Sequence, residues 1–421
     1  MTILIKQAKI VDPSSSFNGR TADIFIENGV IQKINSSLNE KADQVIKEDN
    51  LHVSPGWVDP FAHFADPGFE NKETIETGAK AAIAGGFTDV FLIPNTNPAV
   101  HDKSMVEYIV QKAKSQSLNI FPIGAITKNT DGRELAEMYD MKMSGAKAFS
   151  DGINSVQTAG IFLKALQYVK AFNGIIIQVP DDKSINPQGL MNEGIISTQL
   201  GMPGKPSIAE ELIVERDIKL ALYADSKIHF TGISTGCSLE QIKNAKENNG
   251  QISCSVTPYH LFFCDEELVQ YDTNLKVNPP LRNTTDRDAI RKGISDGIID
   301  CIATHHLPHE KDCKILEFEN ARNGMIGLET AYAVIRTAMP EITQETWVNL
   351  LSVNTRKIFQ LPSAQIVEGN NATITLFNPD VKWTVTEKNI FSKSKNSPFL
   401  GRELTGKALG TLYGDSLNIL S

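Results

Sequence analysis

The feature that most constrains the fold of this chain is a series of eight short apolar runs, most of them separated by segments with helical spacing. The runs lie at residues 57–58, 90–93, 120–123, 146–149, 175–177, 228–230, 252–254 and 299–303. Helical patterns occur between them, for example over residues 73–84 and 208–223. Because eight strands that alternate with helices are typical of a closed α/β architecture, residues 54–364 are predicted to form a (β/α)8 barrel.

The two ends of the chain differ from this middle part and are similar to each other. Strand-like segments occur at residues 3–5, 23–26, 30–31 and 373–377. Glu-Asn-Gly at 27–29 is typical of a hairpin turn, and Asn-Pro-Asp at 378–380 is typical of a turn after a strand. We therefore expect residues 1–53 and 365–421 to pair into one small β-sandwich module.

Charge and composition argue against several classes of protein. The formal net charge is −9 and no basic run is present, which argues against a nucleic-acid surface. No apolar run is long enough for a membrane span, and no secretory leader is expected. The five cysteines are scattered and never form a CxxC pair, so neither a disulfide framework nor a thiolate zinc site is expected. These features favour a cytoplasmic protein.

The most informative residues lie where the predicted strands end, because a barrel of this kind builds its active site there. Motifs at these positions run in order along nearly the whole chain. They are SPGWVD (54–59), DPG (66–68), ETIETG (73–78), GGFT (85–88), PNTNP (94–98), GAKAFSDG (145–152), YDTN (271–274), KVNPPLR (276–282), GLET (327–330) and SKSKNSPF (392–399). This ordered set resembles dihydroorotases of the long bacterial type. The resemblance implies an amidohydrolase barrel with a composite β module.

The resemblance also implies a zinc centre, against which the first strand end can be compared. In such enzymes zinc activates a water and polarises the amide carbonyl, and an aspartate on the last strand moves the proton. The family pattern after the first strand is Asp-x-His-x-His-x-Arg, whereas residues 59–65 here are Asp-Pro-Phe-Ala-His-Phe-Ala. His63 is kept, but Phe61 replaces the first histidine. Ala65 replaces the arginine that would bind the substrate carboxylate.

Three further strand ends depart from the family pattern. The family has histidine ligands at the ends of the fifth and sixth strands, whereas this sequence has Gln178 and Gly232 there. After the eighth strand, His305 replaces the catalytic aspartate, and Asp151 alone remains where the family often has two aspartates. Together these changes remove most zinc ligands and the proton shuttle, so we expect no standard zinc site and no other cofactor.

The remaining polar residues leave alternatives open. Three of them match family positions near the substrate: Asn95, Asn278 and His309. Asparagine is also frequent in turns, so structural support is an equally good interpretation of the first two. His63, Asp151 and His305 could assemble a different metal site, since imidazole and carboxylate both bind zinc. His305 could also act as a general base without a metal.

These observations lead to three hypotheses about function. The first is a dihydroorotase homologue without hydrolytic activity that assembles with aspartate transcarbamoylase in pyrimidine biosynthesis, as the resemblance implies. The second is an active dihydroorotase, or a related cyclic-amide hydrolase, with a rearranged zinc site; Ala65 argues against dihydroorotate as its substrate. The third is a sensor whose pocket still binds a small molecule. The resemblance further implies a homodimer, and charge and composition indicate neither a nucleic acid nor a membrane as partner.

Overall fold

The structure, a computed structural model, describes residues 1–248 and 250–420. The barrel strands are β6 (Trp57–Ala62), β7 (Phe87–Leu92), β8 (Asn119–Gly124), β9 (Ala148–Phe149), β10 (Ile175–Gln178), β13 (Lys227–Thr231), β14 (Ile252–Val256) and β15 (Cys301–Ile302). They form one parallel sheet in the order β15-β14-β13-β10-β9-β8-β7-β6. A backbone bridge between Ala62 and His306 joins its two edges. The predicted barrel is confirmed, and each strand overlaps a predicted apolar run.

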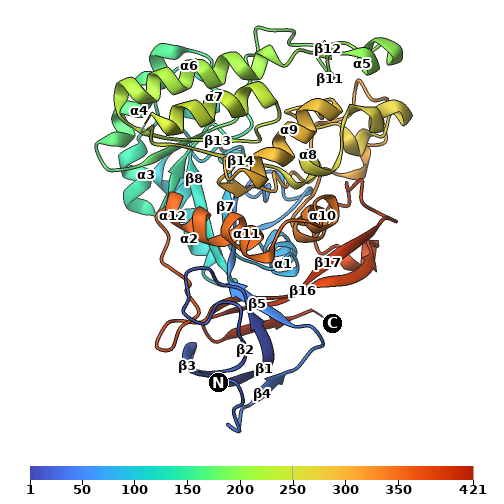
Figure 1. Cartoon of the computed structure of the whole chain (residues 1–421). Helices are drawn as coiled ribbons and strands as arrows, with labels where there is room; N and C mark the ends of the chain where they lie inside the picture. Colours follow the sequence, from blue (N-terminus) through green and yellow to red (C-terminus); the bar gives the residue numbers. More distant parts are fainter. Residues whose placement is uncertain (249, 421) are drawn as a thin grey trace.

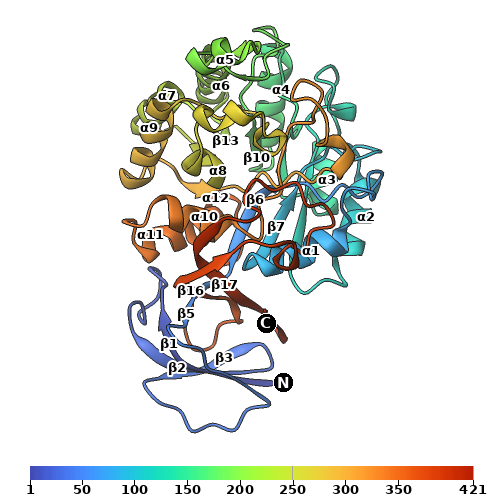
Figure 2. The same cartoon turned by 90° about the vertical axis from the view of Figure 1, so that its right-hand side faces the viewer.

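Helices cover the outside of the barrel (Figures 1 and 2). The α-helices of the described residues are α1 (Ile75–Ala84), α2 (Lys103–Ala113), α3 (Met138–Ser144), α4 (Ala159–Lys170), α5 (Ile195–Leu200), α6 (Ile208–Ala224), α7 (Gly236–Glu247), α8 (Pro258–Phe262), α9 (Thr284–Ser295), α10 (Ala331–Ala338), α11 (Gln344–Val348) and α12 (Asn354–Ile358). Of these, α5 lies away from the barrel wall and contacts the short helical turn Asp265–Gln270. Thr74 caps α1 because its side chain accepts a hydrogen bond from the Thr77 backbone N–H. Both predicted helices, α1 and α6, are confirmed. No described helix is long and apolar enough to cross a bilayer.

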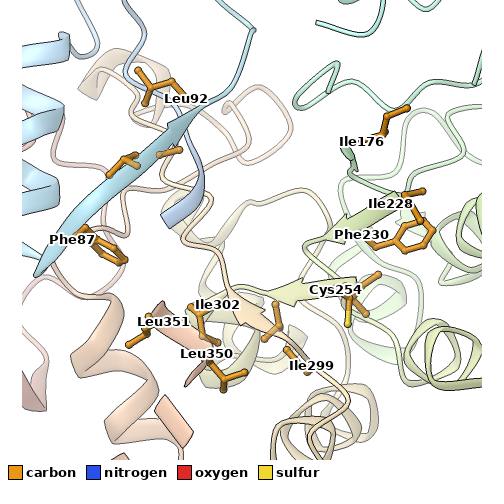
Figure 3. Packing of buried hydrophobic residues seen from close by; sticks show 14 of the residues in the cluster. Phe87, Leu92, Ile176, Ile228, Phe230, Cys254, Ile299, Ile302, Leu350 and Leu351 are labelled. Carbon is orange, nitrogen blue, oxygen red and sulfur yellow. The ribbon is translucent and has the colours of Figure 1, made fainter. Parts of the chain in front are cut away.

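Side chains of the barrel strands alternate between two buried layers. In β10, Ile176 packs outward in the cluster beneath the helices, whereas Ile175 and Ile177 belong to the cluster inside the barrel. Figure 3 shows part of the outer layer, with Ile228 and Phe230 of β13 beside Ile176. Each such burial contributes roughly 1.5–3 kcal/mol to folding. The side of the strand on which a residue falls therefore decides whether its side chain can reach the barrel interior.

The chain termini share a second sheet at the base of the barrel (Figure 1). Its strands are β1 (Thr2–Ile10), β2 (Thr21–Glu27), β3 (Val30–Asn35), β4 (Gln44–Ile46), β5 (His52–Pro55), β16 (Thr373–Thr384), β17 (Glu403–Tyr413) and β18 (Ser416–Ile419). The N-terminal and C-terminal strands meet where β5 pairs with β16 in antiparallel register, for example Pro55 with Ile374. A separate apolar cluster from both ends fills this module. The predicted pairing of the termini is confirmed.

Two predicted turns in this module have different outcomes. The hairpin between β2 and β3 is confirmed, since Asn28 and Gly29 both have positive φ (49° and 72°), as a tight two-residue hairpin turn requires. Residues 378–380 make the predicted turn, but the turn lies inside β16 and does not end the strand. Asn378 Oδ1 accepts the backbone N–H of Asp380, which makes a local turn, and β16 then resumes after a shift in register. A two-stranded ribbon, β11 (Met191–Asn192) with β12 (Gly204–Lys205), lies outside both sheets.

Candidate functional site

A cavity of about 120 Å³ lies at the C-terminal ends of the barrel strands. Its walls are mostly apolar, and residues that matter for its chemistry include Phe61, Val179, Asn278, His305, His306 and Asn323. This is the place where a barrel of this type carries its active site. The predicted site is therefore present as a cavity, and its chemistry depends on the side chains that line it.

Three of the substituted positions pack against one another at the centre of this site. The ring of His305 lies against the ring of Phe61, with centroids 4.5 Å apart and an angle of 33° between the planes. A Cβ on Gly232 would come within 2.7 Å of His305 Cε1, so no larger side chain fits there while His305 stays in place. Gly232 also has a φ of 74°, which favours glycine. The three changes are thus sterically complementary.

His305 begins a chain of hydrogen bonds that runs into the barrel. Its Nε2 lies 2.8 Å from the Thr231 hydroxyl, which accepts from Ser255 at 2.8 Å. Ser255 in turn lies 3.0 Å from Nε2 of His229, whose Nδ1 lies 2.8 Å from Ser253 Oγ. Burial lowers the pKa of both imidazoles to about 3. Both rings are therefore neutral at physiological pH, and His305 brings no charge to the cavity.

His63 and Asn95 are held by the protein itself. His63 Nε2 donates to the backbone carbonyl of Asn95 at 3.1 Å, and burial lowers the pKa of this imidazole to about 4. The Asn95 amide donates to the Asp151 carbonyl at 3.0 Å and accepts from the Ile153 N–H at 3.0 Å. Asn95 thus ties the loop after β7 to the loop after β9. Ala65 is fully buried with a φ of 58°, and its methyl group offers no hydrogen bond.

The three residues considered for a different metal site, His63, Asp151 and His305, do not come together in the structure. Asp151 accepts both the N–H and the hydroxyl of Thr127, at 2.9 and 2.5 Å, in the loop after β8. Burial raises the pKa of the Asp151 carboxyl to about 6. Each of the three candidates is thus committed to a different partner. Within residues 1–248 and 250–420, no three His, Cys, Asp or Glu side chains come together in a group that could hold a metal ion.

The position expected to end the fifth strand requires a correction. Gln178 does not face the cavity; its Nε2 donates to Asp217 Oδ2 on α6 at 3.0 Å. Val179, one residue further along, lies in the interior cluster with Ile175 and Ile177 and lines the cavity. Val179 is therefore the residue that would have to supply a ligand from this strand. Alternation along the strand places Val179 on the same face as Ile175 and Ile177, but three successive isoleucines do not reveal in the sequence which face points inward.

The three histidines after β15 do not form one cluster. His306 lines the same cavity as His305, but its Nδ1 accepts the Gly327 N–H at 3.2 Å and its Nε2 lies 3.6 Å from a Glu73 oxygen. His309 lines a second cavity instead, and its Nε2 lies 2.8 Å from the Asn323 carbonyl. These three histidines, close together in the sequence, therefore line two different cavities.

Asn278 lines the first cavity and is hydrogen-bonded to an ion pair that the sequence did not reveal. Lys205 Nζ lies 2.6 Å from Asp181 Oδ2, and both side chains are largely buried. The Asn278 amide accepts from Lys205 at 3.2 Å and donates to Asp181 at 3.3 Å. Lys205 carries no local sequence signal, because it comes from β12, far from Asn278 in the chain. This pair leaves Asn278 with little capacity to bind a ligand through its oxygen.

The donor set does not fit zinc. A zinc site needs three or four nitrogen, oxygen or sulfur ligands that converge on one point. Here Phe61, Val179 and Gly232 offer a ring, methyl groups and a hydrogen atom at three strand ends. Of the two ring nitrogens of His63, only Nδ1 has no hydrogen-bond partner among the described residues. A single such nitrogen does not hold a zinc ion.

Comparisons with known proteins agree with the architecture. A family model described as Dihydro-orotase-like matches residues 51–238. The dihydroorotase of Geobacter metallireducens is 39% identical over 418 residues, which cover 98% of each chain. That of Carboxydothermus hydrogenoformans is 40% identical and covers 98% of this chain and 97% of its own. The solved L-hydantoinase of Arthrobacter aurescens has the same fold, with a TM-score of 0.86 at 20% identity over 100% of this chain and 97% of its own. By its similarity over the whole length to these relatives, the chain belongs to the dihydroorotase family.

Proposed function

We propose that this chain is a member of the dihydroorotase family that does not hydrolyse cyclic amides. The observation that carries the proposal is the packing of Phe61, His305 and Gly232 at the centre of the cavity. Hydrolysis of an amide in this family needs a group that polarises the carbonyl and activates a water. The Phe61 ring supplies neither function, and His305 is a weak base because burial lowers the pKa of its imidazole to about 3. The lack of a cationic clamp at Ala65 further weakens any binding of a substrate carboxylate.

We further propose that the chain acts as a non-catalytic subunit in an assembly with aspartate transcarbamoylase. Two observations support this proposal. The barrel and the β module are intact around a site that lacks the family's zinc ligands and catalytic aspartate, and the chain resembles bacterial dihydroorotase-like chains without activity. A scaffold that keeps its core while it loses its ligands fits a structural role better than a catalytic one. A homodimer of this chain within the assembly is part of the same proposal.

An active enzyme is the second candidate, and one observation favours it. Relatives named dihydroorotase are about 39% identical over the whole chain. An active form would need a metal site built from groups other than the family ligands. It would also need a substrate that does not rely on a charged partner at Ala65, such as a cyclic amide without a carboxylate.

Metal content and turnover separate these candidates. The full chain, purified from cells grown with added zinc, is analysed for bound metal and assayed with dihydroorotate and with hydantoin. The dihydroorotase of Geobacter metallireducens, prepared in parallel, is the positive control. We expect substoichiometric zinc and no turnover above the uncatalysed rate. One zinc per chain, with activity that disappears on chelation, would refute the proposal.

The partner is tested separately. The chain and the aspartate transcarbamoylase subunit of the same organism are mixed and analysed by gel filtration with light scattering. Co-elution in a fixed ratio is the expected result. If the transcarbamoylase elutes alone at micromolar concentrations, the assembly proposal fails, whereas the proposal of an inactive site stands or falls with the metal analysis.

A further inference from the structure

A second and larger cavity, of about 490 Å³, lies beside the first and plays no part in the function proposed above. It is bounded by the loop that follows β15 and by the segment from Lys393 to Asn396. Its lining includes His309, Lys311, Lys314, Lys393 and Lys395. Four ammonium groups around one cavity are the first sign that it suits an anion.

The lysines around this cavity have no carboxylate partners among the described residues. Glu310 and Glu387 also line the cavity, yet neither forms an ion pair within the described part of the chain. Three of the four ammonium groups, those of Lys314, Lys393 and Lys395, bind backbone carbonyls instead. Lys395 Nζ donates to Ile390 O at 2.6 Å and to Ser392 O at 2.8 Å, and Lys393 Nζ donates to Glu70 O at 2.6 Å. Because an ammonium has three N–H donors, both lysines keep donors for a ligand.

Lys314 is the most buried of the four. Its side chain is 8% exposed, and its Nζ donates to the carbonyls of Thr273 and Arg322 at 2.8 and 2.7 Å. Lys276, which is 4% exposed, lies close by and likewise has no carboxylate partner among the described residues. Burial, followed by the charge of Lys276, lowers the pKa of the Lys314 ammonium to about 7. Buried charges without a counter-ion are costly, and a bound anion would offset that cost.

His309 provides an independent sign of a ligand. It is 6% exposed, and its Nε2–H donates to the carbonyl of Asn323. The Nδ1 atom therefore carries the lone pair, and it has no hydrogen-bond partner among the described residues. A buried acceptor of this kind is rarely left unsatisfied. Its natural partner is a hydroxyl group of a molecule held in the cavity that His309 lines.

We propose that this cavity binds a small phosphate monoester that also carries hydroxyl groups. The phosphate oxygens accept hydrogen bonds from the ammonium groups of Lys314, Lys393 and Lys395, and a hydroxyl of the ligand donates to His309 Nδ1. Lysine suits a phosphate because it acts as a point charge with several donors. The cavity is a different one from the cavity that Phe61 and His305 line, although His309 matches a family position near the substrate.

The test uses ribose 5-phosphate as the probe, with ribose, inorganic phosphate and succinate as comparison ligands, at constant ionic strength. Binding to the full chain is measured by calorimetry. Ribose 5-phosphate should bind more tightly than inorganic phosphate, and ribose should not bind. Absence of ribose 5-phosphate binding at millimolar concentration overturns the proposal. Succinate binding tighter than both phosphates overturns the assignment to a phosphate.

Two variants with the same loss of charge identify the site. Lys393→Met combined with Lys395→Met removes two exposed lysines of the cavity. Lys219→Met combined with Lys243→Met removes two exposed lysines from α6 and α7. The cavity variant should bind ribose 5-phosphate at least roughly tenfold more weakly, as expected for lost charged hydrogen bonds, and the control should bind as the unmodified chain does. Equal affinities in both variants refute the site. An unchanged thermal unfolding midpoint shows that each variant is folded.

A spectroscopic readout tests the role of His309. Imidazole nitrogen resonances are recorded while ribose 5-phosphate is added to the labelled chain, with His309→Phe used for assignment. The Nδ1 resonance of His309 should shift as the ligand binds. If ribose 5-phosphate saturates the chain and the Nδ1 resonance of His309 does not shift, the contact assigned to His309 is contradicted.

Discussion

His305 occupies the space that any side chain on Gly232 would need, with its Cε1 2.7 Å from the position of a Cβ at that glycine. Two residues 73 positions apart in the chain thus depend on each other. In the family pattern one is a metal ligand and the other a catalytic carboxylate. Because both are replaced, the side chain of His305 fills the space beside Gly232. The stability of the barrel mouth should therefore be sensitive to substitution of either residue.

Gly232→Ala should destabilise the chain through this contact. The substitution places a Cβ on a residue with positive φ, which costs about 1 kcal/mol. The clash of this Cβ with His305 costs a further 1–3 kcal/mol or so. Gly132→Ala is a matched control, because Gly132 has nearly the same φ (75°) and nothing within 4 Å of the added Cβ. Urea unfolding should show the larger loss for Gly232→Ala. Adding His305→Ala should remove the clash between the two residues; equal losses at both glycines would contradict the steric relationship.

Thr231→Val should also lower the free energy of unfolding. The change removes the hydroxyl between His305 and Ser255 and leaves a buried imidazole nitrogen without a partner. The expected cost is about 1–3 kcal/mol. Thr411→Val is the control, since Thr411 is equally buried and its hydroxyl has no hydrogen-bond partner among the described residues. That control should be neutral or stabilising. If both variants behave alike in denaturant unfolding, the hydrogen-bonded chain does not contribute to stability.

Asp151 should make stability depend on pH. Burial raises the pKa of its carboxyl to about 6 in the folded chain, above its ordinary value of 3.8. A raised pKa means that the contribution of Asp151 is fully present below pH 3.8 and is lost as the pH rises through 6. Asp151→Asn does not titrate, so its stability relative to the unmodified chain should rise between pH 4 and 7, by on the order of 2–3 kcal/mol. A difference that stays constant over this range would contradict the assignment.

Restoring the family ligands should recover zinc binding only if Val179 is used. A chain with Phe61→His, Gly232→His and His305→Asp receives either Val179→His or Gln178→His as its fourth change. The histidine at 179 points into the cavity, whereas the one at 178 faces α6. Zinc affinity, measured by competition with a chelator, should therefore be roughly 10- to 100-fold higher with Val179→His. Higher affinity with Gln178→His would contradict the inward orientation of residue 179.

The sequence by itself determined the architecture of this protein. Eight apolar runs fix eight buried strands, because a strand covered on both faces needs an apolar side chain at nearly every position. The Asn28-Gly29 turn could also be recognised in the sequence, since few residue types tolerate two successive positive φ values. The loss of histidine at positions 61 and 232 and of aspartate at position 305 was also visible in the sequence, because the donor atoms of a side chain follow from its residue type.

Only the tertiary structure decided how the altered site is filled and where its neighbours point. Gln178 and Val179 are adjacent, and the face each presents depends on how β10 sits between β9 and β13. The contacts of His305 with Phe61 and Gly232 join three strands that are distant in the chain. The second cavity brings the lysines of the C-terminal segment to the loop after β15. Such contacts arise from packing in three dimensions, which local spacing in a sequence does not encode.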